Sequence, residues 1–354
     1  MQDLDPDKLQ QFVGKMLGDI GGALGVSTVR IGVRLGLFDA LHSGGPATAP
    51  ELAARAGGLA ERYVREWALA QAANGYVDYD AGSDRFSLSP HQAMVFAVPD
   101  SPVYLSAAFD VAAAMIEAEP KVEAAFRSGS GVRWGDSAAC LFCATGAFFR
   151  PGYVNNVVQN WLPALEGMID RLHAGASVAD VGCGVGFSTL LMARAFPQSR
   201  FVGFDFHEPS VVEARRHAKE HGLADRVRFE TANAKDIAER DFDLVTTFDC
   251  LHDMGDPAGC AAHMRRILKT DGAWMVVEPL AGDRPEQNLN PVGRLFYNAS
   301  TMICVPTSLD QEVGAALGAQ AGEARLAEVL HKGGFTNVRR VSETPFNMVL
   351  QART

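Results

Sequence analysis

The stretch VADVGCGVGFS, at residues 178–188, constrains the fold of this chain more than any other feature. Three glycines alternate with other residues directly after a short apolar run, and the following TLLMARAF has the character of a helix start. Glycines in a turn between a strand and a helix let backbone N–H groups approach a ligand, which also meets the positive end of the helix. The stretch therefore predicts a nucleotide-binding loop in an α/β fold.

The spacing of the glycines argues against the two common phosphate-binding patterns. A G-x-G-x-x-G fingerprint that starts at Gly182 needs its third glycine at position 187, which is Phe187, and no Lys follows Gly186. What remains is D-x-G-x-G-x-G, which begins at Asp180. A carboxylate there would repel a pyrophosphate, but it can orient the ammonium of an amino-acid-like ligand, directly or through water.

Further strands and helices alternate after this loop. Apolar strands are expected to end near Asp205 and to span 227–230, 242–248 and 273–279. Such alternation predicts a Rossmann-like, doubly wound parallel sheet that binds ligands at the carboxyl ends of its strands. Two closing strands, near 336–342 and 346–352, are expected to complete a mostly parallel seven-stranded sheet.

Chemically suitable residues fall at these strand ends. Asp205 lies nineteen residues beyond Gly186, close to the spacing at which a carboxylate binds ribose hydroxyls, and capping of the next helix is a compatible role. Asn233 follows the next strand and offers an amide oxygen to an adenine amino group. Phe248 and Glu278 end the two strands after it.

Residues 150–354 resemble the class I S-adenosylmethionine-dependent methyltransferases. The resemblance rests on this glycine motif and on the acidic residue after the next strand. The resemblance implies a domain that binds S-adenosyl-L-methionine and releases S-adenosyl-L-homocysteine. That class often has an acidic residue where this chain has Asn233. The cofactor contacts that the resemblance implies are Asp180, Gly182, Gly184, Gly186, Asp205, Phe206, Asn233, Ala234, Phe248, Asp249 and Tyr153.

Residues 1–150 predict a different, mainly helical domain, with the methyltransferase domain at 151–354. An amphipathic helical stretch over residues 16–44 is expected to break near Gly25. Thr48 and Glu51 form a capping box that opens a helix, a longer helix ends at Gly75, and YVDYDAGSDRFSLSP predicts a hairpin. Two helices followed by a two-stranded wing predict a winged helix.

A winged helix can bind DNA, so its charges matter. Residues 51–99 carry four Arg, no Lys and six acidic residues, whereas a DNA-reading helix needs basic side chains that face phosphates. The net charge of −10 also argues against binding to nucleic acids or anionic membranes in general. We therefore favour a protein–protein module over the alternative, a cofactor-responsive DNA-binding regulator.

The whole chain is similar to bacterial winged-helix-fused methyltransferases, which resemble plant-type small-molecule O-methyltransferases. That family implies a homodimer formed through the N-terminal domain, which also contributes to the substrate pocket. The pair His252-Asp253 stands where the plant-type enzymes have His-Asp, which implies His252 as the general base and Glu278 as the residue that orients it. A third acidic residue of the family matches either Glu323, with a shift, or Gln320.

The insertion at about 281–322 is longer than a plain connection needs and is rich in aromatic, Met and Cys side chains, so it is expected to form a substrate lid. Together with Phe148 and Phe149 it indicates a small, largely apolar acceptor, aromatic or acyl. A base matters for a hydroxyl acceptor, which favours O-methylation. N- or C-methylation by proximity alone stays an alternative.

The composition, with 354 residues of which 47% are hydrophobic, allows two full cores. The acidic start MQDLDPDKLQ is unlike a secretory signal and no apolar run has the length of a membrane span, so a cytoplasmic protein is expected. Cys140 and Cys143 form a C-x-x-C without a second pair or a neighbouring histidine. This predicts two buried thiols on a helix and no metal site.

Overall fold

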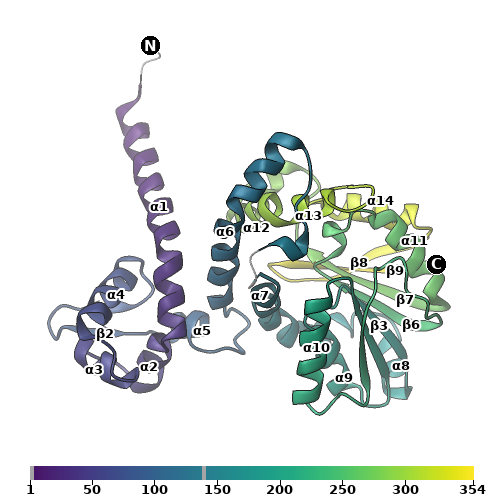
Figure 1. Cartoon of the computed structure of the whole chain (residues 1–354), viewed down its shortest axis with the longest axis horizontal. Helices are drawn as coiled ribbons and strands as arrows, with labels where there is room; N and C mark the ends of the chain where they lie inside the picture. Colours follow the sequence, from purple (N-terminus) through teal and green to yellow (C-terminus); the bar gives the residue numbers. More distant parts are fainter. Residues whose placement is uncertain (1–3, 138–140) are drawn as a thin grey trace. The chain divides into compact units, whose positions relative to one another are not determined.

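The chain, represented by a computed structural model that describes residues 4–137 and 141–354, forms two compact units, Met1–Ala113 and Ala114–Thr354 (Figure 1). The domain boundary expected at residue 150 falls inside helix α7 (Leu141–Asn156) of the second unit. Because α7 packs on α9 (Phe187–Ala195), it belongs to the same body as the glycine loop.

The first unit is a small helical bundle with a two-stranded wing. Its elements are α1 (Pro6–Arg34), α2 (Leu37–Gly44), α3 (Ala49–Arg55), α4 (Glu61–Ala73), β1 (Asp78–Asp80), β2 (Arg85–Ser87) and α5 (Pro90–Phe96). The antiparallel β1–β2 pair is the predicted hairpin, and the predicted capping box between Thr48 and Glu51 opens α3. The buried core includes Phe38, Trp67 and Phe86.

The predicted break near Gly25 is wrong, because α1 runs without interruption to Arg34. A glycine inside a helix costs only about 1 kcal/mol, which packing can outweigh. Here the face that carries Gly25, Val29 and Gly32 is buried, and a Cβ built on Gly32 would lie 2.4 Å from the ring of Trp67. The small residues therefore allow α1 to pack closely on α4 instead of ending the helix.

The N-terminal half of α1 extends beyond the rest of its unit (Figure 1). Its large apolar side chains are exposed; they include Leu9, Phe12, Leu17, Ile20 and Leu24, which are 49–72% exposed. Among the described residues no single helix is long and apolar enough to cross a membrane, although α1 and α2, bent by 61° at their junction, have that length and composition together.

The second unit is built on the predicted seven-stranded sheet. Its strands are β3 (Ser177–Val181), β4 (Arg200–Asp205), β5 (Val227–Thr231), β6 (Phe242–Phe248), β7 (Leu268–Pro279), β8 (Asn337–Glu343) and β9 (Asn347–Arg353). Their order is β5-β4-β3-β6-β7-β9-β8, in which only β9 runs antiparallel to both of its neighbours. The predicted mostly parallel sheet is therefore confirmed, and β7 begins at Leu268, five residues before the expected start.

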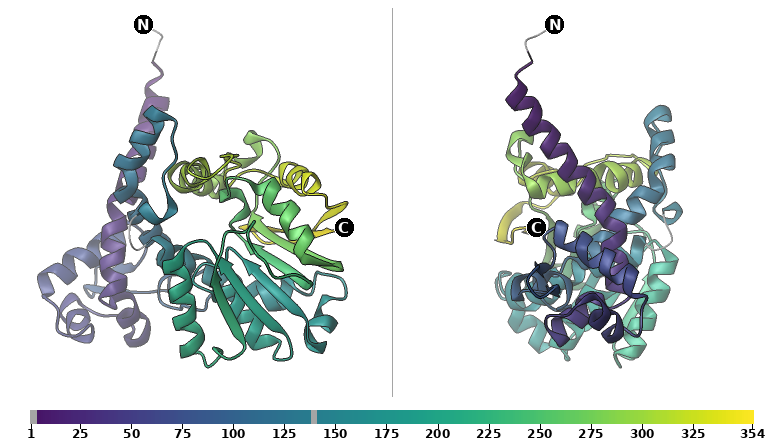
Figure 2. Two further views of the ribbon diagram at one scale, coloured as in Figure 1. Left: turned by 45° about the vertical axis from the view of Figure 1, so that its right-hand side comes forward. Right: turned by 90° about the vertical axis from the view of Figure 1, so that its left-hand side faces the viewer.

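Helices cover both faces of this sheet (Figure 2). Successive residues of a strand point to opposite faces, so Val178 packs in the cluster with α8 (Met168–Ala174), α9 and α10 (Glu208–Glu220), while Ala179 packs with α11 (Pro257–Ile267) and α14 (Glu323–Lys332). Burial on both faces explains why the strands appear as continuous apolar runs.

The expected lid region between β7 and α14 is largely helical. It contains η4 (Pro285–Asn288), α12 (Pro291–Ala299), the π-helical turn η5 (Ser300–Cys304) and α13 (Val305–Leu309). The segment before the sheet contains α6 (Ser106–Ser128), η1 (Trp134–Asp136), α7 and η2 (Val157–Trp161). On α7, Cys143 is exposed, so the predicted burial of this thiol is wrong, and Cys140 lies outside the described residues.

Candidate active site

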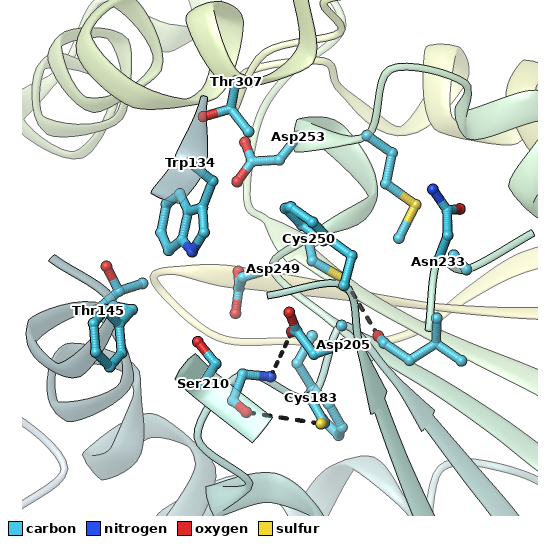
Figure 3. A pocket seen from close by; sticks show the side chains of 18 of the residues that line it. Trp134, Thr145, Cys183, Asp205, Ser210, Asn233, Asp249, Cys250, Asp253 and Thr307 are labelled. Carbon is cyan, nitrogen blue, oxygen red and sulfur yellow. Dashed lines mark hydrogen bonds between the residues drawn. The ribbon is translucent and has the colours of Figure 1, made fainter. Parts of the chain in front are cut away.

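A cavity of about 330 Å³ lies at the carboxyl ends of the central strands (Figure 3). Ten of the residues predicted from the sequence line it: Tyr153, Gly182, Gly184, Asp205, Phe206, Asn233, Ala234, Phe248, Asp249 and Asp253. Four others, Asp180, Gly186, His252 and Glu278, lie behind the lining. The sequence pattern thus placed most of its candidates in one cavity, because strands of a parallel sheet end at the same edge.

The glycine loop needs its glycines for backbone conformation and for close packing. Gly182, Gly184 and Gly186 all have positive φ angles, of 73°, 52° and 83°. A Cβ on Gly182 would lie 2.5 Å from the sulfur of Cys250, and one on Gly186 would lie 2.7 Å from the ring of Phe229. Gly182 and Gly184 therefore present bare backbone to the cavity, whereas Gly186 is the N-cap of α9.

Asp205 ends β4 and holds the glycine loop. Its Oδ2 accepts the Gly184 N–H at 2.9 Å, and its Oδ1 accepts the His207 N–H at 2.9 Å. Burial raises the pKa of Asp205, although these two backbone donors oppose the shift. The carboxylate still borders the cavity, so holding the loop and binding a ligand hydroxyl are compatible roles.

Asp180 has a different environment from the one expected. Its Oδ2 accepts hydroxyl hydrogens from Ser188 at 2.7 Å and Thr189 at 2.6 Å, and its Oδ1 accepts one from Thr246 at 2.9 Å. The side chain is 1% exposed and does not line the cavity. Asp180 therefore ties β3 to α9 and β6, and a direct contact with a ligand ammonium has no support from this geometry.

The burial of Asp180 predicts a measurable pH dependence. Burial raises its pKa from 3.8 to about 6 despite the three hydroxyl donors. A carboxyl group whose pKa is higher in the folded state stabilises the fold at low pH and loses this effect as the pH rises through the folded pKa. A shift of this size is equivalent to about 3 kcal/mol. We expect cofactor-free Asp180→Asn protein to lack this loss between pH 4 and 7 in urea unfolding, and equal pH profiles in both proteins would contradict the assignment.

His252 and Glu278 form a buried pair. His252 lies in the 3-10 turn η3 (Leu251–Asp253) after β6, and its Nδ1 is 2.5 Å from Oε2 of Glu278 at the end of β7. The other oxygen of Glu278 accepts the Leu251 N–H at 2.8 Å. His252 and Glu278 are 4% and 1% exposed. The Leu251 N–H therefore fixes the carboxylate, and the contact with Nδ1 in turn fixes the orientation of the imidazole.

The second ring nitrogen of His252 points to Asp253, whose Oδ1 lies 3.1 Å from Nε2. Cys304, from the expected lid region, has its sulfur within 4.8 Å of both groups. Burial alone would lower the pKa of His252, but the charges of Asp253 and Glu278 outweigh it and raise the pKa well above its usual value. Asp253 lines the cavity and His252 does not, so a molecule in the cavity would meet Asp253 before the imidazole.

Neither candidate for the third acidic residue is recorded beside this imidazole in the described part of the chain. Glu323 accepts a hydrogen bond from Nε of Arg340 at 2.8 Å, and the amide of Gln320 donates to the carbonyl of Ala319 at 2.9 Å. Asp253 is the carboxylate that lies beside the imidazole in addition to Glu278. The sequence predicts Asp253 as a catalytic residue but does not indicate that it lies beside Nε2 of His252. It also does not indicate Cys304, which is 52 positions beyond His252 in the chain.

Asp249 is a buried carboxylate that lines the cavity. It has a positive φ of 52° and is 8% exposed. Its Oδ2 accepts the Tyr153 hydroxyl at 3.1 Å, and its Oδ1 accepts the Asn347 amide at 2.7 Å. Burial and the charge of Glu278 raise its pKa well above 3.8. The sequence did not indicate Asn347, because nothing local marks a partner 98 residues away.

Side chains of the expected lid region hold the loop that follows His252. The Gln311 amide donates to the Asp253 carbonyl at 3.0 Å, and its oxygen accepts the Gly255 N–H at 2.9 Å. The Ser308 hydroxyl donates to the Met254 carbonyl at 2.8 Å. These contacts join the region after α12 to residues 253–255 at the rim of the cavity.

Comparisons with known proteins agree with this fold. Residues 172–334 match the model of a family described as "Methyltransferase domain", and residues 22–97 match "Rv2258c-like winged HTH domain". The ubiquinone biosynthesis O-methyltransferase of Pseudomonas paraeruginosa is 32% identical over 128 residues, which are 35% of this chain and 51% of that protein. The chain thus spans about half the length of this curated relative.

Solved structures match over nearly the whole chain. The mitomycin 7-O-methyltransferase MmcR is 22% identical with a TM-score of 0.61, and the match covers 98% of this chain and 100% of that one. Human N-acetylserotonin methyltransferase in complex with S-adenosylmethionine is 16% identical with a TM-score of 0.71, covering 100% and 99%. These likenesses show a shared fold, and together with the two family matches they lead to one conclusion: the chain joins a region that matches a winged HTH domain, at residues 22–97, to a Rossmann-like region that matches a methyltransferase domain, at residues 172–334.

Proposed function

We propose that this protein is an enzyme, a methyltransferase that uses S-adenosyl-L-methionine to methylate a small molecule. The observation that carries the proposal is the cavity itself, in which the glycine loop, Asp205 and Asn233 meet at adjacent strand ends. Relatives whose names describe O-methyltransferases support it. The test is calorimetry with S-adenosyl-L-homocysteine: the native protein should bind it at one site per chain, and no binding would contradict the proposal.

The residues on the cavity fit such a cofactor. Asp205 would accept the ribose hydroxyls, Asn233 and Ala234 would border the adenine, and the bare backbone at Gly182 and Gly184 would lie beside the methionine part, because all five residues line the cavity. The Asn233 oxygen already accepts the Lys235 N–H at 3.1 Å, and its second lone pair remains for the adenine amino group. Phe206, Phe248 and Tyr153 supply apolar contact surface around these groups.

For a hydroxyl acceptor we propose His252 as the general base. The bound cofactor supplies an electrophilic methyl group, and the protein's share is to align the acceptor in line with it. Glu278 fixes the imidazole, and Asp253 yields its place at Nε2 to the acceptor or relays the proton between them. The raised pKa of His252 brings the base closer to a phenol of pKa ~10, which makes proton removal during attack less costly.

We propose a small, largely apolar acceptor, with an aromatic one favoured over an acyl one. Trp134, Phe142 and Phe149 line the cavity on one side, and Met254 and Thr307 line it near the loop that follows His252. Aromatic walls with a few polar groups suit a flat ring that carries a hydroxyl. The region 281–322 contributes Thr307 and Gln311 to the lining, in agreement with a lid.

We also propose a homodimer formed through the first unit, in which the exposed apolar face of α1 is covered by the partner. Exposed apolar surface of this extent marks an interaction site. Full-length protein should be a dimer in light scattering at tens of micromolar. Phe12→Asp with Leu24→Asp should convert it to a monomer or an aggregate, while Lys15→Ala on the same helix should leave it dimeric. A monomeric native protein would count against the proposal.

No observation favours the regulator alternative. On α4, Arg62 pairs with Glu66 at 2.5 Å and Arg65 with Asp84 at 2.8 Å, so these cations already have acidic partners. A gel shift at physiological salt separates the two functions, because a regulator would retard a specific duplex and the proposed enzyme would not.

A further inference from the structure

The cavity has an uneven distribution of charge. Five carboxylates line it, whereas Lys235 is the only Lys or Arg among the described lining residues. Lys235 lies 2.9 Å from Asp256 and also contacts Glu312, so the one cation of the lining is already paired with two carboxylates on the side proposed for adenine. Asp249 lies at the other end, after β6, where the lining contains no lysine or arginine. The positive charge that acts on Asp249 is that of the His252 imidazole, which Asp253 and Glu278 already flank.

The carboxylate of Asp249 is held in place by three separate elements. Its backbone N–H donates to the Val277 carbonyl on β7 at 2.8 Å, Tyr153 reaches it from α7, and Asn347 reaches it from β9. The left-handed backbone is uncommon at a residue other than glycine and persists where the surroundings impose it. Each oxygen accepts one hydrogen bond and retains a free lone pair.

The strand order places Asp249 where the amino-acid part of the proposed cofactor would end. With adenine beside Asn233 after β5 and ribose beside Asp205 after β4, as proposed above, the remainder of the molecule would extend past β3 toward β6. At β3 the cavity floor is the bare backbone of Gly182, which packs directly on Cys250, the residue next to Asp249. Figure 3 shows Asp249 facing the same cavity as Asp205.

Asp180, the residue that the glycine motif offers for a ligand ammonium, is committed elsewhere. Three of the four lone pairs on its oxygens accept hydroxyl hydrogens, and the side chain is 1% exposed and does not line the cavity. Resting on the proposed function, we propose that Asp249 binds the α-ammonium of the cofactor's methionine part, with Tyr153 and Asn347 as the residues that position its carboxylate. An ammonium supplies the donors for the two free lone pairs and the countercharge that this end of the cavity lacks.

The test compares two ligands that differ at the proposed contact. S-adenosyl-L-homocysteine carries the α-ammonium, whereas 5′-methylthioadenosine has the same adenosine and thioether but no amino-acid part. A buried hydrogen bond to a charged group contributes about 1.5–3 kcal/mol. In calorimetry we therefore expect Asp249→Asn to weaken the binding of S-adenosyl-L-homocysteine by roughly 10- to 150-fold. The same variant should change the binding of 5′-methylthioadenosine by less than about twofold.

Matched variants make the result specific. Asn347→Ala should weaken binding of S-adenosyl-L-homocysteine less than Asp249→Asn does and should spare methylthioadenosine. Asp180→Asn should leave the ratio of the two affinities unchanged, because that carboxylate acts through the loop. If Asp180→Asn lost affinity for S-adenosyl-L-homocysteine relative to methylthioadenosine and Asp249→Asn did not, Asp180 would be the residue that binds the ammonium. That result would overturn the proposal.

The other outcomes are equally decisive. Equal weakening of both ligands in Asp249→Asn means a structural role, and no weakening means no contact. If Asp249→Asn weakens the binding of S-adenosyl-L-methionine and not that of S-adenosyl-L-homocysteine, Asp249 contacts the sulfonium instead of the ammonium. Each of these overturns the proposal while the native protein still binds its ligands. If the native protein binds none of the three ligands, the proposed function itself fails, and that result is distinct.

Discussion

Replacement of His252 by Asn should lower turnover by roughly 10²–10⁴-fold with a hydroxyl acceptor and leave the affinity for S-adenosyl-L-homocysteine nearly unchanged. In the proposed mechanism the imidazole acts on the acceptor, and His252 is not among the residues that line the cavity proposed for the cofactor. Glu278→Gln should give a smaller loss in the same direction, because it loosens the orientation of the ring. Turnover is measured with labelled cofactor, and affinity by calorimetry.

The pH profile separates a base from a positioning group. His252 must be unprotonated to accept a proton, so kcat/KM should rise with pH through its pKa, which Asp253 and Glu278 raise above 6.5. This acidic limb should disappear in His252→Asn and move to lower pH in Asp253→Asn, which removes one of the two charges. A limb that persists without His252 would favour an amine or carbon acceptor, methylated by proximity alone.

The second large effect is expected at Asp205. Asp205→Ala should cost about 1–3 kcal/mol of affinity for S-adenosyl-L-homocysteine, because ribose hydroxyls in a closed site would lose their acceptor. The variant also removes the acceptor of the Gly184 and His207 N–H groups, so the loop itself loosens. Asp205→Asn keeps one oxygen as an acceptor, so its affinity should lie between those of the native protein and Asp205→Ala. Calorimetry measures the affinities, thermal unfolding checks the fold, and unchanged binding in Asp205→Ala would contradict the assignment.

The features that sequence predicted best are those set by local pattern. Strand ends follow from where an apolar run stops, and the parallel order brings those ends to one edge, which is why Asp205, Asn233 and Asp249 share a cavity. The positive φ angles of the glycine loop likewise follow from residue type.

The features that sequence missed depend on partners far apart in the chain. Asn347 and Tyr153 hold Asp249 from positions about 100 residues away on either side, and no spacing rule connects them. The role of Asp180 shows the same limit, since only the folded chain brings Thr246 to a carboxylate that the motif offers to a ligand. The predicted helix break near Gly25 is wrong because helix propensity depends on the local sequence, whereas the tight packing of α1 depends on residues elsewhere in the chain.

The contacts that Gln311 and Ser308 make with residues 253–255 bear on how acceptor preference can be engineered. Because these side chains hold the backbone directly after His252, the insertion supports the position of the proposed base and is not an independent flap. An insertion grafted from another methyltransferase would exchange the walls of the acceptor site and displace His252 at the same time. A chimera that retains turnover should therefore need residues 251–256 and 300–316 transferred as one block.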